Sequence, residues 1–353
     1  MTNLVPYCDL KAGTLGYSFR SMSPPPAEKK SNVIQFSLTE GCSYATCKFC
    51  EMYDRGTYSV KTFPAFQEHV NLVLGALEFE GRFRVKDNVT IDRIFIGGGN
   101  ALSVDTELLL DATQYALNEV RKFTGKIPRR LTLYGNTKDI LSHDGSHGLT
   151  NLRCGGTCGA CSIDRLGDRR GLELVYWGLE SGNTDVLKLV GKGYTAEEAR
   201  EAFKILNRSS IRSSIMVMPG LGGVAYSEPH IADTVAVLNE GRPEFITFIG
   251  LMVAPNTPYA RWMEKEEERQ INRRLTPTEI AEQTARIIEL LSFETTVGVH
   301  GADVHTYCLN PVYVGATKLR DNADAKKLAV ALRTSAFEQG LSTLDWTDVF
   351  LSE

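Results

Sequence analysis

The sequence predicts an α/β protein whose core is a partial, TIM-like (β/α)6 barrel, and three observations support this class. Six short apolar segments alternate with helix-like segments between residues 33 and 290, which is the order expected for a parallel sheet with helical crossovers. Right-handed crossovers curl such a sheet towards a barrel. Glycine and polar residues follow the ends of these segments, where parallel barrels place their chemistry.

The individual elements follow in order along the chain. The six expected strands cover residues 33–38, 91–96, 131–134, 174–178, 215–218 and 245–253. Apolar residues recur at helical spacing over about 64–80, 105–123 and 231–238, which predicts three of the helices. Two further helices are expected to begin at the capping boxes Thr195–Glu198 and Thr276–Glu279, the second with Pro277 at its first position.

Length, composition and charge limit the class of protein. The chain has 353 residues, a normal length for one α/β barrel or for two domains. A hydrophobic content of 42% supplies a sizeable core and excludes a disordered chain. The net charge of −4 argues against a broad nucleic-acid-binding face. Neither a signal peptide nor an apolar run of about 20 residues is visible, so we expect a cytoplasmic protein that does not enter a membrane.

Composition shifts divide the chain into parts. Residues 1–32 are expected to form an N-terminal arm, because Ser23–Pro26 is stiff and extended. The barrel is expected over 33–290. It is interrupted at 137–170 by an insertion rich in glycine and cysteine. Residues 291–353 are expected to form a C-terminal extension.

Three cysteines follow the first predicted strand. Cys42, Cys47 and Cys50 lie within nine residues, and Phe49 precedes the third. Thiolates are soft ligands that suit iron–sulfur clusters, which usually take four cysteines. A trio without a local fourth cysteine therefore leaves one metal position open. A zinc knuckle or simply buried thiols are the alternatives.

The segment 41–53 resembles the cluster loop of radical S-adenosylmethionine (radical SAM) enzymes. That resemblance implies a [4Fe–4S] cluster on Cys42, Cys47 and Cys50, with SAM on the fourth iron. The reduced cluster would cleave SAM to a 5′-deoxyadenosyl radical, and Phe49 would lie near the adenine. The usual spacing is three and then two intervening residues, whereas this chain has four and then two.

Later motifs extend the resemblance over about residues 33–290. Gly97–Leu102 resembles the turn that binds the methionyl amino group of SAM, which implies roles for Gly98, Gly99 and Asn100. Family members often carry an acidic residue in this turn, but Asn100 brings no charge. Asn136 follows the third predicted strand and is expected at the same edge of the sheet.

Two further motifs resemble one branch of that superfamily, which includes oxygen-independent coproporphyrinogen oxidases, tRNA methylthiotransferases and the elongator catalytic subunit. The segment 177–182 resembles the fourth-strand motif of this branch and implies that Glu180 and Ser181 contact SAM. The segment 214–223, which contains Met218, resembles the fifth-strand segment that flanks the adenine.

A second triplet lies in the insertion. Cys154, Cys158 and Cys161 have the spacing of three and then two residues, but they do not follow the first strand. Three interpretations stay open: an auxiliary iron–sulfur cluster, a structural zinc site or reduced thiols without a metal. The candidates for a fourth zinc ligand are His143, His147, Cys8 and Cys308.

Together these motifs predict a radical SAM enzyme of unresolved reaction type. We expect a small-molecule or peptide substrate and a reducing donor such as flavodoxin or ferredoxin, and no nucleic acid. Cys308 is a candidate hydrogen-atom donor to a substrate radical, although a buried inert thiol is the simpler interpretation. The alternatives are a methylthio- or methyl-transferring radical enzyme that uses the second cluster, and a non-catalytic zinc-binding protein on a degenerate barrel.

Overall fold

The computed structural model describes residues 8–9, 14–15, 25, 32–50, 53, 57–84, 91–144, 148–155, 171–251, 253–301 and 312–339. The chain divides into two compact units, which are described separately. The first unit comprises residues 1–45, 53–176 and 205–212, and the second comprises 46–52, 177–204 and 213–353. Strand β8 (Leu172–Glu180) runs from the first unit into the second.

The first unit contains a mainly parallel sheet. Its described strands are β1 (Cys8–Asp9), β2 (Thr14–Leu15), β3 (Val33–Ser37), β6 (Arg93–Gly97) and β7 (Arg130–Gly135). β1 and β2 are antiparallel, whereas β2–β3, β3–β6 and β6–β7 are parallel pairs. All five residues of β3 are buried, as expected for a strand in a parallel sheet that is covered on both faces.

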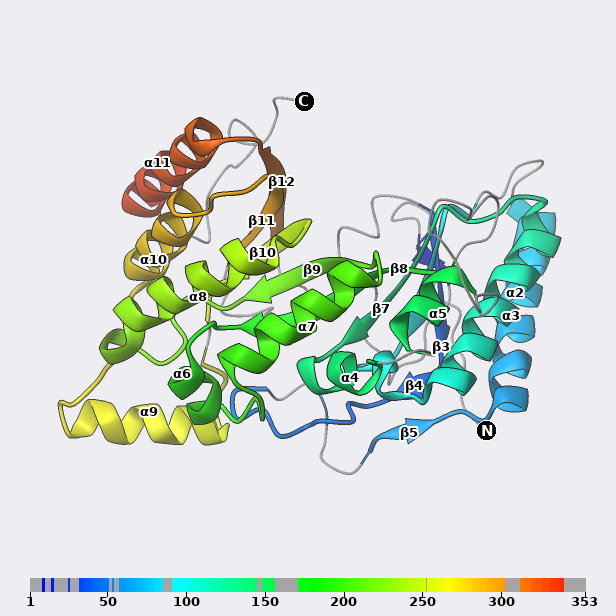
Figure 1. Ribbon diagram of the computed structural model, residues 1–353, viewed down its shortest axis with the longest axis horizontal. Coiled ribbons are helices and arrows are strands. Elements are labelled where there is room, and N and C mark those ends of the chain that lie inside the picture. The colour runs from blue at the N-terminus through cyan, green and yellow to red at the C-terminus, as the bar shows by residue number, and fades with distance from the viewer. Residues whose placement is uncertain are drawn as a thin grey trace. The chain divides into compact units, whose positions relative to one another are not determined.

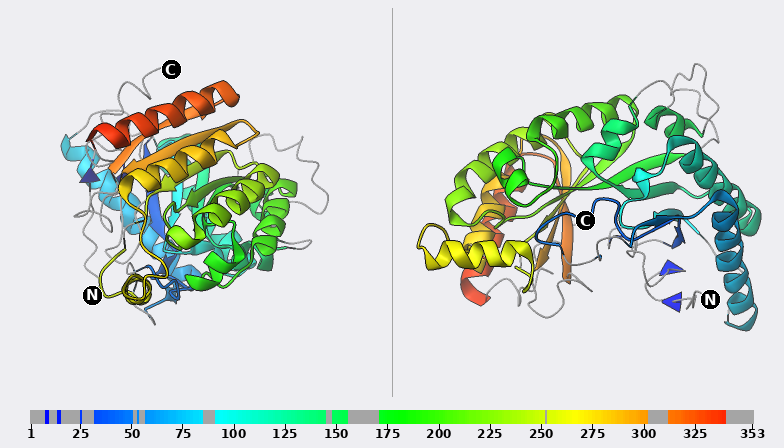
Figure 2. Two further views of the ribbon diagram at one scale, coloured as in Figure 1. Left: turned by 90° about the vertical axis from the view of Figure 1, so that its left-hand side faces the viewer. Right: turned by 90° about the horizontal axis from the view of Figure 1, so that it is seen from below.

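Helices and a short ribbon complete the first unit. The long helices α2 (Phe63–Arg84) and α3 (Thr106–Thr124) lie side by side (Figures 1 and 2). Asp105 caps the start of α3, and Gly125 ends it at φ +70°, a left-handed conformation that favours glycine. The remaining elements are β4 (Thr39–Glu40), β5 (Ser59–Val60), the 3₁₀ turn η1 (Ala101–Ser103), α4 (Thr137–Ser142) and α5 (Leu149–Cys154).

The second unit also contains a mainly parallel set of strands. These are β9 (Arg212–Val217), β10 (Phe245–Ile249), β11 (Thr295–Gly301) and β12 (Val312–Leu319). β9, β10 and β11 are parallel neighbours, and β12 is antiparallel to β11. The helices are α6 (Thr184–Leu189), α7 (Ala196–Arg208), α8 (Ser227–Gly241), α9 (Pro258–Glu268), α10 (Pro277–Glu289) and α11 (Asn322–Gln339), with the 3₁₀ turn η3 (Val224–Tyr226) before α8. The end of α7 (residues 205–208) and the first residue of β9 belong to the first unit.

These elements confirm the predicted α/β class with parallel strands, and each of the six expected strands is present. Both predicted capping boxes form: Glu198 caps the backbone N–H of Thr195, and Thr276 and Glu279 cap one another. The sixth strand ends at Ile249 instead of Val253, because the N–H of Leu251 donates to the carbonyl of Pro219 (2.8 Å) and so leaves the strand ladder.

The part of the chain after residue 290 carries structure that the sequence did not predict. β11, β12 and α11 lie in the part that was expected to be an extension, and β11 pairs directly with β10. Helices α10 and α11 lie side by side, with α11 next to β12 (Figures 1 and 2). Arg333 of α11 binds both Glu282 and Glu289 of α10. None of the described helices has the length and apolar character needed to cross a membrane.

Candidate functional site

The glycine turn after β6 is fixed against the segment that leads to the first cysteine. The N–H of Gly99 donates to the carbonyl of Gly41 at 3.0 Å. A Cβ on Gly99 would lie 2.7 Å from that oxygen, and a Cβ on Gly98, at φ +127°, would lie 1.7 Å from Thr39 Oγ1. Both positions therefore need glycine because of contacts within the protein. Their predicted contact with SAM stays a prediction.

Asn100, at the end of this turn, has a buried side-chain amide whose hydrogen bonds are only partly satisfied. Its side chain is buried, with the residue only 2% exposed. Its Nδ2 donates to Ser43 Oγ (2.6 Å) and to Asp139 Oδ2 (2.5 Å), so both amide hydrogens are used. Among the described residues, its buried Oδ1 accepts no hydrogen bond. A buried acceptor without a donor is costly, so this atom fits a ligand that brings an N–H or O–H group.

Asp139 is a site residue that the sequence did not reveal. It lies in the first turn of α4 and is half-buried. Burial raises the pKa of its carboxyl group, and the hydrogen bond from Asn100 opposes that rise. Asn136 caps α4 by accepting the N–H of Asp139 at 3.0 Å. The structure thus gives Asn136 a capping role, and its predicted cofactor contact stays a prediction.

The first cysteine triplet is divided between the two units. Cys42 belongs to the first unit, where its Sγ accepts from the N–H of Ala45 (3.5 Å), whereas Cys47 and Cys50 belong to the second. None of these thiols forms a disulfide. Over the described ranges, no three His, Cys, Asp or Glu side chains lie close enough together to hold a metal ion. The cluster on these cysteines therefore stays a prediction. Three thiols within nine residues of sequence suit such a cluster chemically, since metal binding commonly organises its own ligands.

The segment around Cys47 and Phe49 is anchored within the second unit. The N–H of Lys48 donates to the carbonyl of Val190 (2.8 Å), and the carbonyl of Lys48 accepts from Tyr259 N–H (3.1 Å). Phe49 is buried in one apolar cluster with Met218, and Cys47 packs against it. The other buried members are Val186, Val190, Leu221, Leu251, Tyr259 and Met263. Two residues predicted to lie near the adenine, Phe49 and Met218, therefore share one cluster.

A buried ion pair lies at the end of β8. The carboxylate of Glu180 accepts from Lys192 Nζ at 3.3 Å, and each side chain is 10% exposed. Burial lowers the pKa of Lys192, but the charges of Glu180, Tyr194 and Cys47 and the hydrogen bond to Glu180 together outweigh burial, so the net pKa is raised and Lys192 stays protonated. Glu180 itself has φ +60°, a left-handed conformation that costs energy for a non-glycine residue.

Ser181 points into the interior hydrogen-bond network of the second unit. Its hydroxyl accepts from the N–H of Asn183 (3.0 Å) and meets His230 Nδ1 at 2.9 Å. Burial lowers the pKa of His230 to about 4, so the ring is neutral at neutral pH, and the tautomer of the ring decides whether Nδ1 or the Ser181 hydroxyl donates in this bond. Helix α8 also supplies Thr234, which accepts from Gly182 N–H at 2.9 Å. Hydrogen bonds to His230 and Thr234 of α8 thus fix the turn that bears Glu180.

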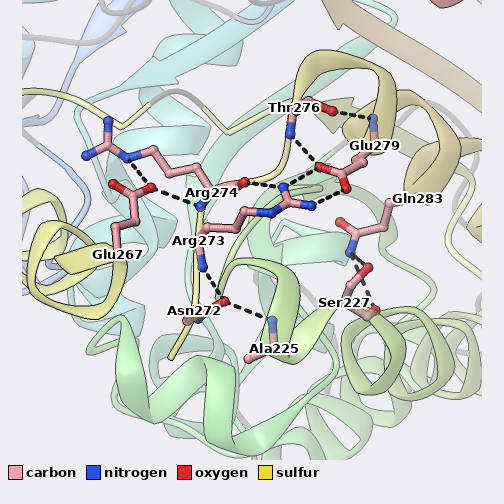
Figure 3. A network of polar contacts seen from close by, with 9 residues as sticks. All are labelled: Ala225, Ser227, Glu267, Asn272, Arg273, Arg274, Thr276, Glu279 and Gln283. Carbon is pink, nitrogen blue, oxygen red and sulfur yellow. Dashed lines mark hydrogen bonds and ion pairs between the residues drawn. The ribbon is translucent and has the colours of Figure 1, made fainter. Parts of the chain in front are cut away.

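The loop after β9, which was predicted to flank the adenine, is held by later parts of the chain. Gly222 N–H donates to Tyr259 Oη (2.9 Å), and Gly220 N–H donates to Gln283 Oε1 (2.6 Å). Asn272 accepts from Ala225 N–H and donates to the carbonyl of Gly222. Figure 3 shows the bond between Ala225 and Asn272 together with the polar contacts at the start of α10.

Two arginines lie in the segment just before α10. Arg273 forms a two-pronged pair with Glu279 (2.7 and 2.8 Å), and Arg274 approaches Glu267 at 3.4 Å (Figure 3). Both arginines are exposed. They therefore serve the start of α10 and its preceding loop.

The described part of the second triplet shows no metal ligand. Cys154 ends α5 and is 2% exposed, its Sγ donates to the carbonyl of Thr150 (2.7 Å), and burial raises its pKa. Both ring nitrogens of His143 are engaged, with Thr106 Oγ1 (2.8 Å) and the Leu102 carbonyl (2.7 Å). Cys158, Cys161, His147 and Cys308 lie outside the described residues, as does the side chain of Cys8. The metal at this triplet stays a prediction.

Comparison with known proteins finds solved structures with a similar fold. No protein-family model matches the chain. A structure of the cobalamin-dependent radical SAM enzyme OxsB with aqua-cobalamin and SAM bound matches with a TM-score of 0.51 and 12% sequence identity, over 74% of this chain and 41% of OxsB. Apo OxsB matches with a TM-score of 0.50 and 13% identity, over 72% of this chain and 40% of OxsB.

A structure of the Elp3 protein from Methanocaldococcus infernus matches with a TM-score of 0.45 and 15% identity, over 78% of this chain and 59% of Elp3. That value is too low to support an argument, so membership of the elongator-like branch stays a prediction. This chain spans about two fifths of the length of OxsB. The shared feature is the fold: the α/β architecture of this chain is also found in OxsB.

Proposed function

We propose that this chain is a radical SAM enzyme. The observation that carries the proposal is the position of Cys42, Cys47 and Cys50, which directly follow the first long parallel strand of a fold shared with OxsB. A [4Fe–4S] cluster held by these three cysteines would supply the electron that cleaves SAM to a 5′-deoxyadenosyl radical.

Several residues of this chain support such chemistry. The members of the apolar cluster around Phe49 and Met218 are buried, and a reactive radical requires surroundings without water. Lys192 and Cys47 attract one another electrostatically when the thiol is deprotonated, and the thiolate is the form that binds iron. Asn100 offers a buried acceptor that no described residue uses.

The finer assignments are part of the same proposal. The substrate is a small molecule or a peptide, the electron donor is a flavodoxin or ferredoxin, and the protein acts in the cytoplasm. The net charge of −4 supports a substrate other than nucleic acid. The reaction that follows hydrogen abstraction is left open, and it includes methyl or methylthio transfer with a second cluster at Cys154, Cys158 and Cys161.

Anaerobic purification and reconstitution with iron and sulfide test the proposal. We expect a brown protein that forms 5′-deoxyadenosine from SAM when it is reduced. A variant with Cys42, Cys47 and Cys50 changed to alanine should lose about four irons per chain and all SAM cleavage.

The matched control changes Cys154, Cys158 and Cys161 to alanine. It should keep SAM cleavage by the first cluster, and it loses further iron only if a second cluster is present. A colourless wild-type protein with stoichiometric zinc and no SAM cleavage would refute the enzyme and favour the zinc-binding alternative.

A further inference from the structure

The chain segment that carries the first cysteine triplet is closed at its base by a short ribbon. Strand β4 comes directly before this segment, and β5 follows it and pairs antiparallel with β4, with Glu40 opposite Ser59. Beside this pair, the N–H of Lys61 donates to the carbonyl of Leu38 at 3.0 Å. The ribbon therefore joins the two ends of residues 41–58, which contain all three cysteines of the triplet.

A ribbon of two short strands is only marginally stable by itself, so other contacts must support it. One is the ion pair between Lys61 Nζ and Glu40 Oε1 (3.3 Å), whose side chains are only 22% and 19% exposed. Another is a close approach of two backbones. A Cβ on Gly41, at φ +71°, would lie 3.0 Å from the carbonyl oxygen of Thr57. The returning part of the segment thus packs against the residue that precedes Cys42.

Tyr58 ties this returning part to the turn after β6. Its hydroxyl oxygen lies 2.5 Å from Ser103 Oγ, and Ser103 Oγ lies 2.7 Å from the carbonyl oxygen of Asn100. A carbonyl oxygen can only accept, so the Ser103 proton goes to Asn100 and Tyr58 is the donor to Ser103. The same turn is held on the carbonyl of Gly41 by the N–H of Gly99 (3.0 Å). The two ends of the segment are therefore fastened to one turn.

We propose that Tyr58 is a positioning residue for the [4Fe–4S] cluster, which acts through Ser103 to fix the segment around Cys42 before iron is bound. The inference rests on the proposed function, under which Cys42, Cys47 and Cys50 hold that cluster. A loop whose ends are already joined has less conformational entropy to lose when its metal ligands become ordered. The protein therefore retains the cluster more tightly, although Tyr58 itself binds no iron.

Cluster retention measures this role without any turnover. The anaerobic, reconstituted protein is mixed with an excess of an iron chelator, and the decay of the visible absorbance of the cluster gives a rate of loss. Tyr58→Phe keeps the ring and removes only the hydroxyl group. It should lose the cluster about 3- to 10-fold faster than the wild type, as expected for one hydrogen bond of ordinary strength.

Variants of Ser103 separate a specific hydrogen bond from a general loss of packing. Ser103→Ala should lose the cluster at least as fast as Tyr58→Phe, whereas Ser103→Thr, which keeps a hydroxyl group, should stay at the wild-type rate. The double variant Tyr58→Phe/Ser103→Ala should match Ser103→Ala alone, because Tyr58 acts through Ser103. The contrast between alanine and threonine keeps the test decisive if Tyr58→Phe is poorly folded.

The matched control is Tyr115→Phe. The Tyr115 hydroxyl donates to Asn71 Oδ1 (3.0 Å) and ties α3 to α2 instead of to the cysteine segment. This variant also loses one tyrosine hydroxyl bond, but it should retain the cluster as the wild type does. Thermal melting of the metal-free proteins reports whether the variants are equally folded.

Two results would overturn the role of Tyr58 while the proposed function stands. One is a wild-type rate of cluster loss in both Tyr58→Phe and Ser103→Ala. The other is an equal acceleration in Tyr58→Phe and Tyr115→Phe, which would mean that any lost hydroxyl bond has this effect. A wild-type protein that takes up no iron–sulfur cluster on reconstitution would overturn both the role of Tyr58 and the proposed function.

Discussion

Two strand ends in this molecule carry polar turns of opposite character, one in each unit. The turn after β6 has an acceptor surplus, because Asn100 and Asp139 meet each other but leave Asn100 Oδ1 without a described donor. In the turn after β8 the charge of Glu180 is neutralised, because this carboxylate is paired with the buried Lys192. The comparison shows that turns at equivalent strand ends of a parallel fold can differ in whether their polar groups are satisfied within the protein. An internally satisfied turn favours rigidity, whereas an unsatisfied one favours a ligand.

The largest expected effect comes from breaking the ion pair of Glu180 and Lys192 in the turn after β8. Lys192→Met leaves Glu180 buried without its partner, and removing one member of a buried ion pair costs about 3–5 kcal/mol of unfolding free energy. Urea denaturation of the purified protein measures this loss. The double variant Lys192→Met/Glu180→Gln should recover much of it, because no unpaired charge then remains. A loss below about 1 kcal/mol in the single variant would mean that the pair is solvated, and the contrast between the two turns would fail.

A second prediction uses pH to compare the units, since each holds a buried histidine whose pKa is lowered. Burial lowers the pKa of His69 and of His230 to about 4, below the ordinary value of about 6.5. His69 Nε2 accepts from Ser37 N–H in the first unit (2.9 Å), and His230 contacts Ser181 in the second.

Because the folded pKa is the lower one, the unfolded chain binds more protons between pH 6.5 and 4. The stability from each histidine is thus fully present above about pH 6.5 and is lost as the pH falls towards about 4, by up to about 3 kcal/mol per histidine. His69→Gln and His230→Gln should each flatten the acid limb of a stability–pH curve. If neither substitution changes its slope, these histidines are not buried in the neutral form.

The smallest expected effect distinguishes the serines of the two turns. Ser181 is fully buried, and Ser181→Ala leaves the buried His230 Nδ1 without its hydrogen-bond partner, at a cost of about 1–3 kcal/mol. Ser43 is exposed, so water replaces its hydroxyl, and Ser43→Ala should change stability by less than about 0.5 kcal/mol. Thermal melts of the two variants side by side measure the difference. Equal losses would show that the turn after β6 is as closed as the one after β8.

The sequence predicts well what depends on short stretches of chain. Continuous apolar runs such as Val33–Leu38 identify the parallel strands, and the capping boxes at Thr195 and Thr276 identify helix starts to the residue. Polar residues at strand ends identify the turns at Asn100 and Glu180.

The partners of those turn residues could not be predicted in the same way. Asp139, Lys192 and His230 meet Asn100, Glu180 and Ser181 through tertiary folding, and no local pattern connects such pairs. β11 and β12 were missed for a related reason. Their stability comes from pairing with β10 and with each other, and strand formation depends strongly on such context.

The loop after β9 has a consequence for biosynthesis. Its backbone groups at Gly220 and Gly222 are tied to Gln283, Tyr259 and Asn272, all of which are translated later. A nascent chain that has left the ribosome only as far as β9 cannot yet fasten this loop. The loop can form these hydrogen bonds only after α10 has left the ribosome, so it reaches its native conformation late in synthesis.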